Sequence, residues 1–265
     1  MFMVIFMMMI IFGAYMMMSG GDEEGGGYGN LGGGGINNDG GVVSGDATYN
    51  VSTENVDVGG GSNGANGLVC GDIVKLKAQA SAYPGHDGYL SPCGGEIGGC
   101  GIDVTLRPDS DFQGYEPNSG LRDWKVECPN GSDGDSVVYG DTVKLKSQPD
   151  PTRFSDHVGY LSPCGVGIGG CGTGVTLRSD ANFQGYEPDS GLRDWEFEGG
   201  SGQVGFGTNV KIKSKPNPTR FGGGDHVGYL SPCESKDGCG VDVTLRPDSI
   251  YTPGQNLRHW QIESV

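Results

Sequence analysis

Eight cysteines are the side chains of this 265-residue chain that most clearly point to chemistry, because their positions repeat. Three pairs lie six or seven residues apart, namely Cys93 with Cys100, Cys164 with Cys171, and Cys233 with Cys239. The remaining two, Cys70 and Cys128, flank the first pair. The spacing predicts four disulfides in this pairing, each local one stabilising the fold by about 2–3 kcal/mol. Reduced thiols and zinc are the alternatives, but no C-x2-C spacing supports zinc.

Disulfides imply an oxidising environment, or an oxidation system such as large cytoplasmic viruses carry. We therefore expect the bulk of the chain on the non-cytosolic side of a membrane, or in a virion. Two sequences, Asn50-Val51-Ser52 and Asn130-Gly131-Ser132, match the acceptor pattern for N-glycosylation, which is a weak signal when it stands alone.

Three histidines, His86, His157 and His226, each stand two residues before a Gly-Tyr-Leu sequence. Three symmetry-related imidazoles that met on one axis could bind a metal ion. However, aspartate precedes the histidine in the second and third copies and follows it in the first. No second group stands ready to orient the rings. We therefore expect each histidine to pack or hydrogen-bond within its own loop, and we predict no metal and no other cofactor.

An acidic loop, 109–116, offers oxygen ligands on alternate residues followed by a glycine, as calcium loops do. The second copy keeps the pattern, but the third breaks it, and the twelfth position holds Gly120 instead of glutamate. An ordinary polar loop is therefore the preferred interpretation.

Aromatic residues recur in the same loops, beside acidic and amide groups: Phe112, Tyr115, Phe183, Tyr186 and Tyr251. Exposed rings in such company can stack on sugars, which makes Tyr115, Tyr186 and Tyr251 candidate ligand contacts. The alternatives are that they pack their own loop onto the domain or bury against a partner. We find neither a lone nucleophile with a base nor a single carboxylate pair, so we predict no enzyme activity.

The sequence Gly-Tyr-Leu-Ser-Pro-Cys occurs three times, ending at Cys93, Cys164 and Cys233, within a unit of about 70 residues. Each unit contains four segments of period-two alternation, in the first unit at 73–77, 88–91, 103–107 and 121–127. Twelve strands in three equal sets fit a β-trefoil. Its first and fourth strands form a six-stranded barrel, and its second and third strands form three capping hairpins.

The order Val-x-Leu, Gly-Tyr-Leu, Val-Thr-Leu and a final tryptophan resembles β-trefoil repeats of the ricin-B, fascin and MIR kind, over 71–263. The resemblance implies an all-β domain at 70–265, with repeats at 70–138, 139–205 and 206–265. Such domains bind sugars, proteins or actin, or only pack. Ricin-type lectins end each unit with Gln-x-Trp, whereas this chain has Leu-Arg-Asp-Trp twice and Leu-Arg-His-Trp once.

Residues 1–18 are apolar and carry no charged side chain, and as a helix they would span about 27 Å. A single membrane span is the preferred interpretation, because a signal peptide should have a basic start and a small-residue cleavage site. Residues 19–69 are rich in glycine and predict a flexible tether or arm, with one candidate strand at 48–58.

The net charge of −16 disfavours nucleic acid and anionic lipid head groups as partners. The whole layout resembles small membrane-anchored virion proteins of large DNA viruses. We therefore expect a non-enzymatic, membrane-anchored structural protein that contacts other structural proteins in a surface layer or virion shell, as minor capsid proteins do. The alternative is a surface lectin that binds glycans in the repeat loops.

Overall fold

The structure is a computed structural model that describes residues 67–80, 85–96, 100–112, 119–168, 171–183, 190–221, 224–237, 240–247 and 256–265. The chain divides into two compact units, Met1–Gly59 and Gly60–Val265, and every described residue belongs to the second. The expected span at 1–18, the glycine-rich arm up to residue 66 and the candidate strand at 48–58 lie outside the described residues. Within those residues, no helix is long and apolar enough to cross a bilayer.

Twelve strands follow the sequence repeat in three sets of four. The first set is β1 Ile73–Gln79, β2 Asp87–Glu96, β3 Ile102–Arg107 and β4 Trp124–Glu127. The second is β5 Thr142–Ser147, β6 Tyr160–Ile168, β7 Gly172–Arg178 and β8 Trp195–Glu198, and the third is β9 Asn209–Ser214, β10 Tyr229–Asp237, β11 Gly240–Arg246 and β12 His259–Ser264. Short helical turns lie between them: η1 Asp109–Phe112, η2 Ser155–His157, η3 Asp180–Phe183 and α2 Pro218–Phe221.

The first and fourth strands of the three sets close into a six-stranded antiparallel barrel. β4 pairs with β1 and β5, β8 pairs with β5 and β9, and β12 pairs with β9 and β1. The last pair joins the two ends of the domain, with Val74 opposite Ser264 and Ala78 opposite Trp260. Each of these six strands is paired on both sides, so the barrel leaves no edge open to another chain.

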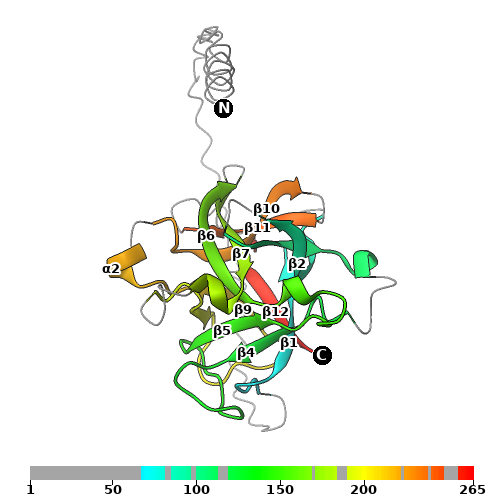
Figure 1. Cartoon of the computed structure of the whole chain (residues 1–265). Coiled ribbons are helices and arrows are strands. Elements are labelled where there is room, and N and C mark those ends of the chain that lie inside the picture. The colour runs from blue at the N-terminus through cyan, green and yellow to red at the C-terminus, as the bar shows by residue number, and fades with distance from the viewer. Residues whose placement is uncertain are drawn as a thin grey trace, which may run out of the picture. The chain divides into compact units, whose positions relative to one another are not determined.

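The second and third strands form three hairpins, β2–β3, β6–β7 and β10–β11, that cap one end of the barrel. β3, β7 and β11 also pair with one another, which closes the cap into a triangle. Figure 1 shows the hairpins gathered above β1, β4 and β5. The prediction of an all-β, β-trefoil-like fold with first and fourth strands in the barrel is confirmed.

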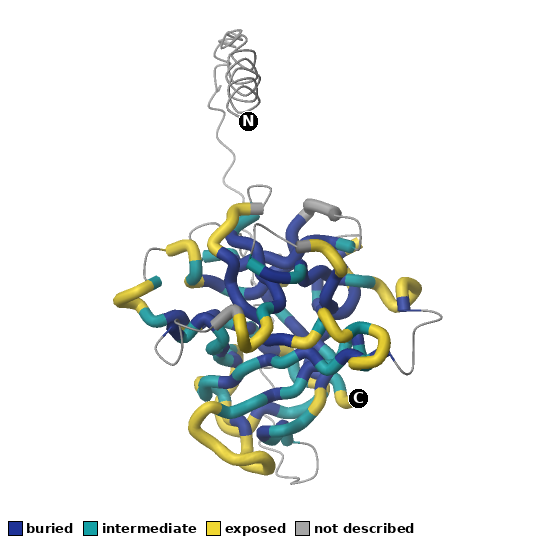
Figure 2. The backbone as a smooth tube through the Cα atoms, in the orientation of Figure 1, coloured by how far each residue is buried: buried dark blue, intermediate teal, exposed yellow. Residues whose placement is uncertain are grey.

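The core follows from the alternation within each strand, because every second side chain points inward. Val74 and Leu76 of β1 are fully buried, and their neighbours along the strand are not. The three tryptophans, Trp124, Trp195 and Trp260, are also fully buried, and each Nε1 donates a 3.0 Å hydrogen bond to a leucine carbonyl of its own repeat's second strand. Figure 2 shows this buried centre surrounded by exposed loops.

The other end of the barrel is closed by three related residues, Leu68, Val137 and Val204, all fully buried. Their backbones form a ring of hydrogen bonds: Leu68 N donates to Val204 O at 2.7 Å, Val204 N to Val137 O at 2.9 Å, and Val137 N to Leu68 O at 3.0 Å. The residues just before β1 are therefore part of the folded domain.

Candidate functional site

Each repeat brings a tyrosine, an arginine, a lysine and a glutamate together at its border with the preceding repeat. At one border, Tyr160 Oη donates a 2.9 Å hydrogen bond to Glu127 Oε2. The Arg193 guanidinium lies 4.6 Å from the centre of the Tyr160 ring, and the Lys146 ammonium lies 5.1 Å from it. The ring is therefore held by two cation–π contacts and one hydrogen bond to a carboxylate.

The same cluster stands at the other two borders. Tyr229 Oη donates to Glu198 Oε2 at 2.7 Å, and Tyr89 Oη donates to Glu263 Oε2 at 2.9 Å. The arginines that cover these rings, each at 4.6 Å, are Arg258 and Arg122. Because Tyr89 is in the first repeat and Glu263 in the third, the three hydrogen bonds run round the whole domain.

These contacts move the pKa values of two tyrosines and of one glutamate further from pH 7. Burial, together with the hydrogen bond to Glu263 and its charge, raises the pKa of Tyr89 to about 12. Burial and Glu127 raise the pKa of Tyr160 well above its usual range. Burial opposes ionisation of Glu198, but hydrogen bonds from Lys213 and Tyr229 outweigh it and lower the pKa of that carboxyl. These three groups therefore keep one protonation state near pH 7, and we assign the clusters to folding.

The acidic loops that were considered as calcium ligands each start with an aspartate that forms an ion pair with an arginine. Asp109 pairs with Arg122, and Asp180 Oδ1 lies 2.7 Å from Arg193 Nη1. Phe112 in the same stretch is almost fully buried against Tyr89 and so cannot stack on a ligand. The candidate ligand contacts Tyr115, Tyr186 and Tyr251, and the side chain of Phe183, lie outside what the structure describes.

The predicted local disulfide pairs are wrong, although the pairing of Cys70 with Cys128 is confirmed. Cys100 is bonded to Cys164, and Cys171 is bonded to Cys233. These bonds exclude the pairs Cys93–Cys100, Cys164–Cys171 and Cys233–Cys239. Cys93 also takes part in a disulfide, and Cys239 lies outside the described residues. The bonds Cys100–Cys164 and Cys171–Cys233 therefore join consecutive repeats instead of pinning single hairpins.

The register of the hairpins explains the difference. In β2–β3, Pro92 lies opposite Val104 and Glu96 lies opposite Ile102, with a bulge between the two pairs. Cys93 therefore sits beside the body of the hairpin, whereas Cys100 lies beyond its last pair. The cysteine at the tip of one hairpin therefore bonds to the cysteine beside the paired strands of the next hairpin. Cys100 and Cys164 are such a pair, and their Cα atoms are 5.5 Å apart.

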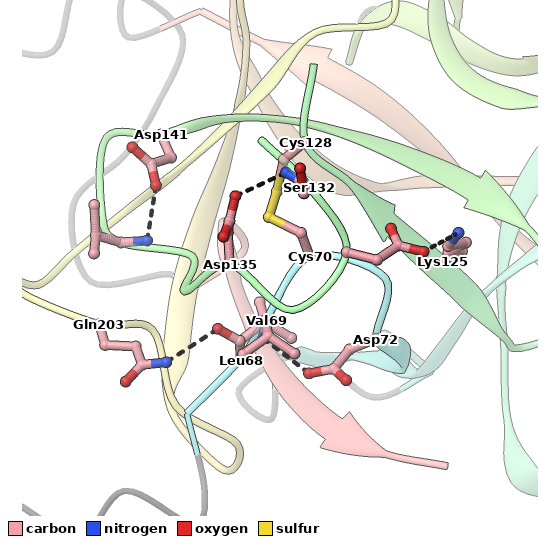
Figure 3. Close-up of a disulfide and its surroundings, with 12 residues drawn as sticks. Leu68, Val69, Cys70, Asp72, Lys125, Cys128, Ser132, Asp135, Asp141 and Gln203 are labelled. Atoms are coloured by element: carbon pink, nitrogen blue, oxygen red, sulfur yellow. Dashed lines mark hydrogen bonds and ion pairs between the residues drawn. A yellow bond between two sulfur atoms is a disulfide. The ribbon is translucent and has the colours of Figure 1, made fainter. Parts of the chain in front are cut away.

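The third described disulfide, Cys70–Cys128, fastens the chain before β1 to the end of β4, as Figure 3 shows. The turn beside it is held by Asp135 Oδ2, which accepts a 2.7 Å hydrogen bond from Ser132 N. A small cavity of about 220 Å³ lies here, lined by Cys70, Cys128, Asn130, Gly131, Asp135, Ser136, Asp141 and Thr142. Its size suits solvent more than a drug-sized ligand.

The three candidate histidines occupy different surroundings. His86 is buried, whereas His157 Nδ1 lies 2.8 Å from Asp156 Oδ1 in its own loop. The ring of His226 lies against Gly165 of the neighbouring repeat. It is so close that a Cβ added to this glycine would lie 3.1 Å from His226 Nε2. Burial lowers the pKa of His226 despite the nearby charge of Asp225. Among the described residues, no group of three histidine, cysteine or acidic side chains is placed to hold a metal ion.

Two matching surface loops went unnoticed in the sequence. They run through 149–158 in the second repeat and 216–227 in the third, and we call them the proline loops. Both contain Pro-Asp/Asn-Pro-Thr-Arg-Phe and Asp-His-Val, whereas the corresponding loop of the first repeat is shorter and lacks the proline-containing sequence. A stretch this similar in the second and third repeats, and missing from the first, is the sequence signal that points to these loops.

The proline loops have the same internal bonds. Asp150 Oδ1 accepts from Thr152 N and Oγ1 at 2.9 and 2.7 Å, and Asn217 Oδ1 accepts from Thr219 N and Oγ1 at 2.9 and 2.6 Å. These bonds from Thr152 also lower the pKa of Asp150. Each loop is fixed to the preceding repeat by one 2.8 Å backbone bond, from Asp150 N to Ser119 O and from Asn217 N to Ser190 O.

A phenylalanine fastens each proline loop, and an arginine and a valine stand outside. Phe154 packs against the buried cluster of Tyr89, Phe112 and Leu121, and Phe221 packs against Tyr160 and Leu192. Arg153, Val158, Arg220 and Val227 are exposed. In Figure 1, α2 of the second proline loop stands at the edge of the domain. Beside it lies an open groove of about 610 Å³, lined by Gly191, Asp194, Ser214, Lys215, Pro216, Asn217, Pro218 and Val227.

Comparison with known proteins gives the fold and nothing finer. No protein-family model matches the chain, and no curated protein matches it significantly. Among the solved structures that resemble it are a Caenorhabditis elegans protein of unknown function and the SDF2-like protein from Arabidopsis thaliana. The first has a TM-score of 0.54 at 16% identity and covers 77% of this chain and 99% of its own. The second has a TM-score of 0.52 at 16% identity and covers 74% and 94%. Likeness at this identity shows a shared fold alone.

Proposed function

We propose that the protein is a non-enzymatic, membrane-anchored structural protein that makes protein–protein contacts in a surface layer or virion shell. The observation that carries this proposal is how the repeated chemical groups are used. The tyrosine hydroxyls and two of the described disulfides cross-link the repeats, and each arginine covers a tyrosine ring of its own repeat. A reactive centre would instead keep such groups open to a substrate.

The proline loops are the contact surfaces in this proposal. They present the same exposed arginine and valine twice on a rigid base, and arginine is enriched where proteins bind each other. Their basic side chains stand out on a chain of net charge −16, so a partner with acidic groups at matching positions fits them best. Residues 1–18 supply the anchor, and the disulfides suit the non-cytosolic side of a membrane.

The test is assembly of the full-length chain in its native source. Replacing both loop arginines (Arg153→Glu with Arg220→Glu) should abolish recovery of the protein in the assembled fraction, while membrane association is retained. Lys125→Glu is the matched control, a charge reversal on the barrel strand β4 that should leave assembly unchanged. Unimpaired assembly of the double variant, or a wild-type protein that is free and monomeric, would contradict the proposal.

A glycan-binding function is the second candidate, and the groove beside the second proline loop favours it. Asp194, Lys215 and Asn217 put polar groups next to Pro216 and Val227, a mixture that suits a sugar. A glycan array with the wild-type chain tests this. Binding in this groove should be lost when Lys215 and Asn217 are together replaced by alanine, and binding in the repeat loops when Tyr115, Tyr186 and Tyr251 are together replaced by alanine. An array with no bound glycan would eliminate the lectin and leave the structural proposal standing.

A further inference from the structure

Asn130, Gly131 and Ser132 lie in an exposed turn that begins at Pro129, next to the disulfide-bonded Cys128. All residues from 129 to 136 are exposed. Gly131 N donates to Cys128 O at 3.2 Å, and Ser132 N donates to Asp135 Oδ2 at 2.7 Å. These two bonds shape the turn through its backbone and use neither the Asn130 amide nor the Ser132 hydroxyl.

We infer that Asn130 is a site of N-glycosylation. An asparagine followed two residues later by serine, with a residue other than proline between them, is the acceptor sequence for this modification. The donor class is an oligosaccharide carried on a polyprenyl diphosphate. A bond forms between Asn130 Nδ2 and the anomeric carbon of the sugar as the bond from that carbon to the diphosphate breaks. The amide loses one proton, and the polyprenyl diphosphate leaves.

Sequence and exposure together single out this asparagine within the described part of the chain. Asn217-Pro218-Thr219 has the right outer residues, but proline in the middle blocks the acceptor conformation. Asn182, Asn209 and Asn256 have no serine or threonine two residues later. The inference rests on the proposed non-cytosolic location, because the glycan donor and the disulfides belong to the same side of the membrane.

The position of the turn gives the modification a consequence. Asn130 lines the small cavity beside Cys70–Cys128, where the described chain enters the barrel, close to the ring made by Leu68, Val137 and Val204. Figure 3 shows Ser132 and Asp135 next to the disulfide and close to Leu68. A glycan here would cover the base of the barrel with solvated sugar, so this end would face solvent and protein contacts would use other surfaces.

The experiment is peptide mapping of the full-length chain from its native source, before and after treatment with a peptide:N-glycosidase. The expected result is a glycopeptide containing Asn130 whose asparagine becomes a carboxylate on treatment. In the same cells, Ser132→Ala should reduce the glycosylated fraction to background, and Ser132→Thr should retain it. The serine is exposed, so both variants should fold. An unmodified Asn130 peptide in the wild-type chain would overturn the inference.

Pro218→Ala separates failure of the inference from failure of the proposed location. This change creates an acceptor sequence at Asn217, which is half-buried but is followed by the exposed positions 218 and 219, so a chain that meets the glycosylation enzyme should be modified there. If this variant is glycosylated at Asn217 and Asn130 stays bare, the inference fails and the location stands. If neither is modified and the cysteines are reduced, both fail.

Discussion

At the scale of single residues, Tyr160 shows how much of a repeat border depends on one hydroxyl. Its Oη reaches across from the second repeat to Glu127 of the first, and the arginine and lysine on its ring hold it in that position. Nothing in the sequence near Tyr160 reveals Glu127 as its partner, because the bond depends on how the repeats close. The equivalent bond of Tyr89 joins residues 174 positions apart.

Tyr160→Phe should lower the free energy of unfolding by about 1–2 kcal/mol, because it removes a hydrogen bond to a carboxylate that is only partly exposed. Denaturant unfolding of the oxidised protein measures this. Tyr139→Phe is the control, since the described structure gives that hydroxyl no hydrogen bond although the ring packs on the core. Equal losses in the two variants would mean that Tyr160 acts through its ring alone.

The raised pKa of Tyr89, about 12 against an ordinary value near 10, predicts a loss of stability in alkali. Above pH 10 the unfolded chain releases this proton while the folded chain keeps it, so the free energy of unfolding falls as pH rises to about 12. Thermal unfolding between these pH values should show the decline, and Tyr89→Phe should make it shallower. A wild-type profile that stays flat would be inconsistent with the described border.

At the scale of elements, the strands were predictable and the cross-links between them were not. In β1, Val74 and Leu76 alternate with lysines. This pattern is local, so the sequence alone predicts which side chains of β1 point into the core. Disulfide partners depend instead on where each hairpin tip lies in the triangle of β3, β7 and β11. The tip cysteine Cys100 is close to Cys93 in sequence, but its partner Cys164 comes from the next hairpin.

Digestion of the unreduced protein should release peptides that join Cys100 to Cys164 and Cys171 to Cys233. Removing the first bond with Cys100→Ala and Cys164→Ala should lower the free energy of unfolding by about 4 kcal/mol on the chain-entropy model, given the separation of 64 residues. A variant lacking both Cys70 and Cys128, with a separation of 58, should lose a similar amount. A peptide that joined Cys93 to Cys100 would restore the local pairing.

At the scale of the whole molecule, the ring of Leu68, Val137 and Val204 ties the first described residues into the folded domain. A chain that starts at Gly67 should keep the melting temperature of the full-length protein within a few degrees. A chain that starts at Ile73 loses a fully buried leucine and the Cys70–Cys128 disulfide, and should be destabilised by about 4 kcal/mol or more. Calorimetry compares the two truncations. Equal stability would show that the ring contributes nothing.

The threefold repeat made the architecture predictable, because twelve short strands in three equal sets leave few closed arrangements. The surfaces were harder to foresee, since they are set where the repeats differ from one another. The proline loops occur in two repeats only. Each is attached to the preceding repeat by a backbone hydrogen bond to Ser119 O or to Ser190 O. The proposed contact surfaces therefore depend less on what recurs three times than on what the first repeat lacks.

The disulfides between consecutive repeats also limit how far the domain can be stretched. When the unfolded chain is pulled taut from Cys70 to Val265, the bonds Cys100–Cys164 and Cys171–Cys233 remove most of its contour from the load-bearing path. At about 3.4 Å per residue, the chain with these two bonds alone would extend to about 240 Å, and the reduced chain to about 660 Å. Disulfide formation thus limits how far the two ends of the domain can be pulled apart. The limit holds even after the barrel has unfolded, because the disulfides are covalent.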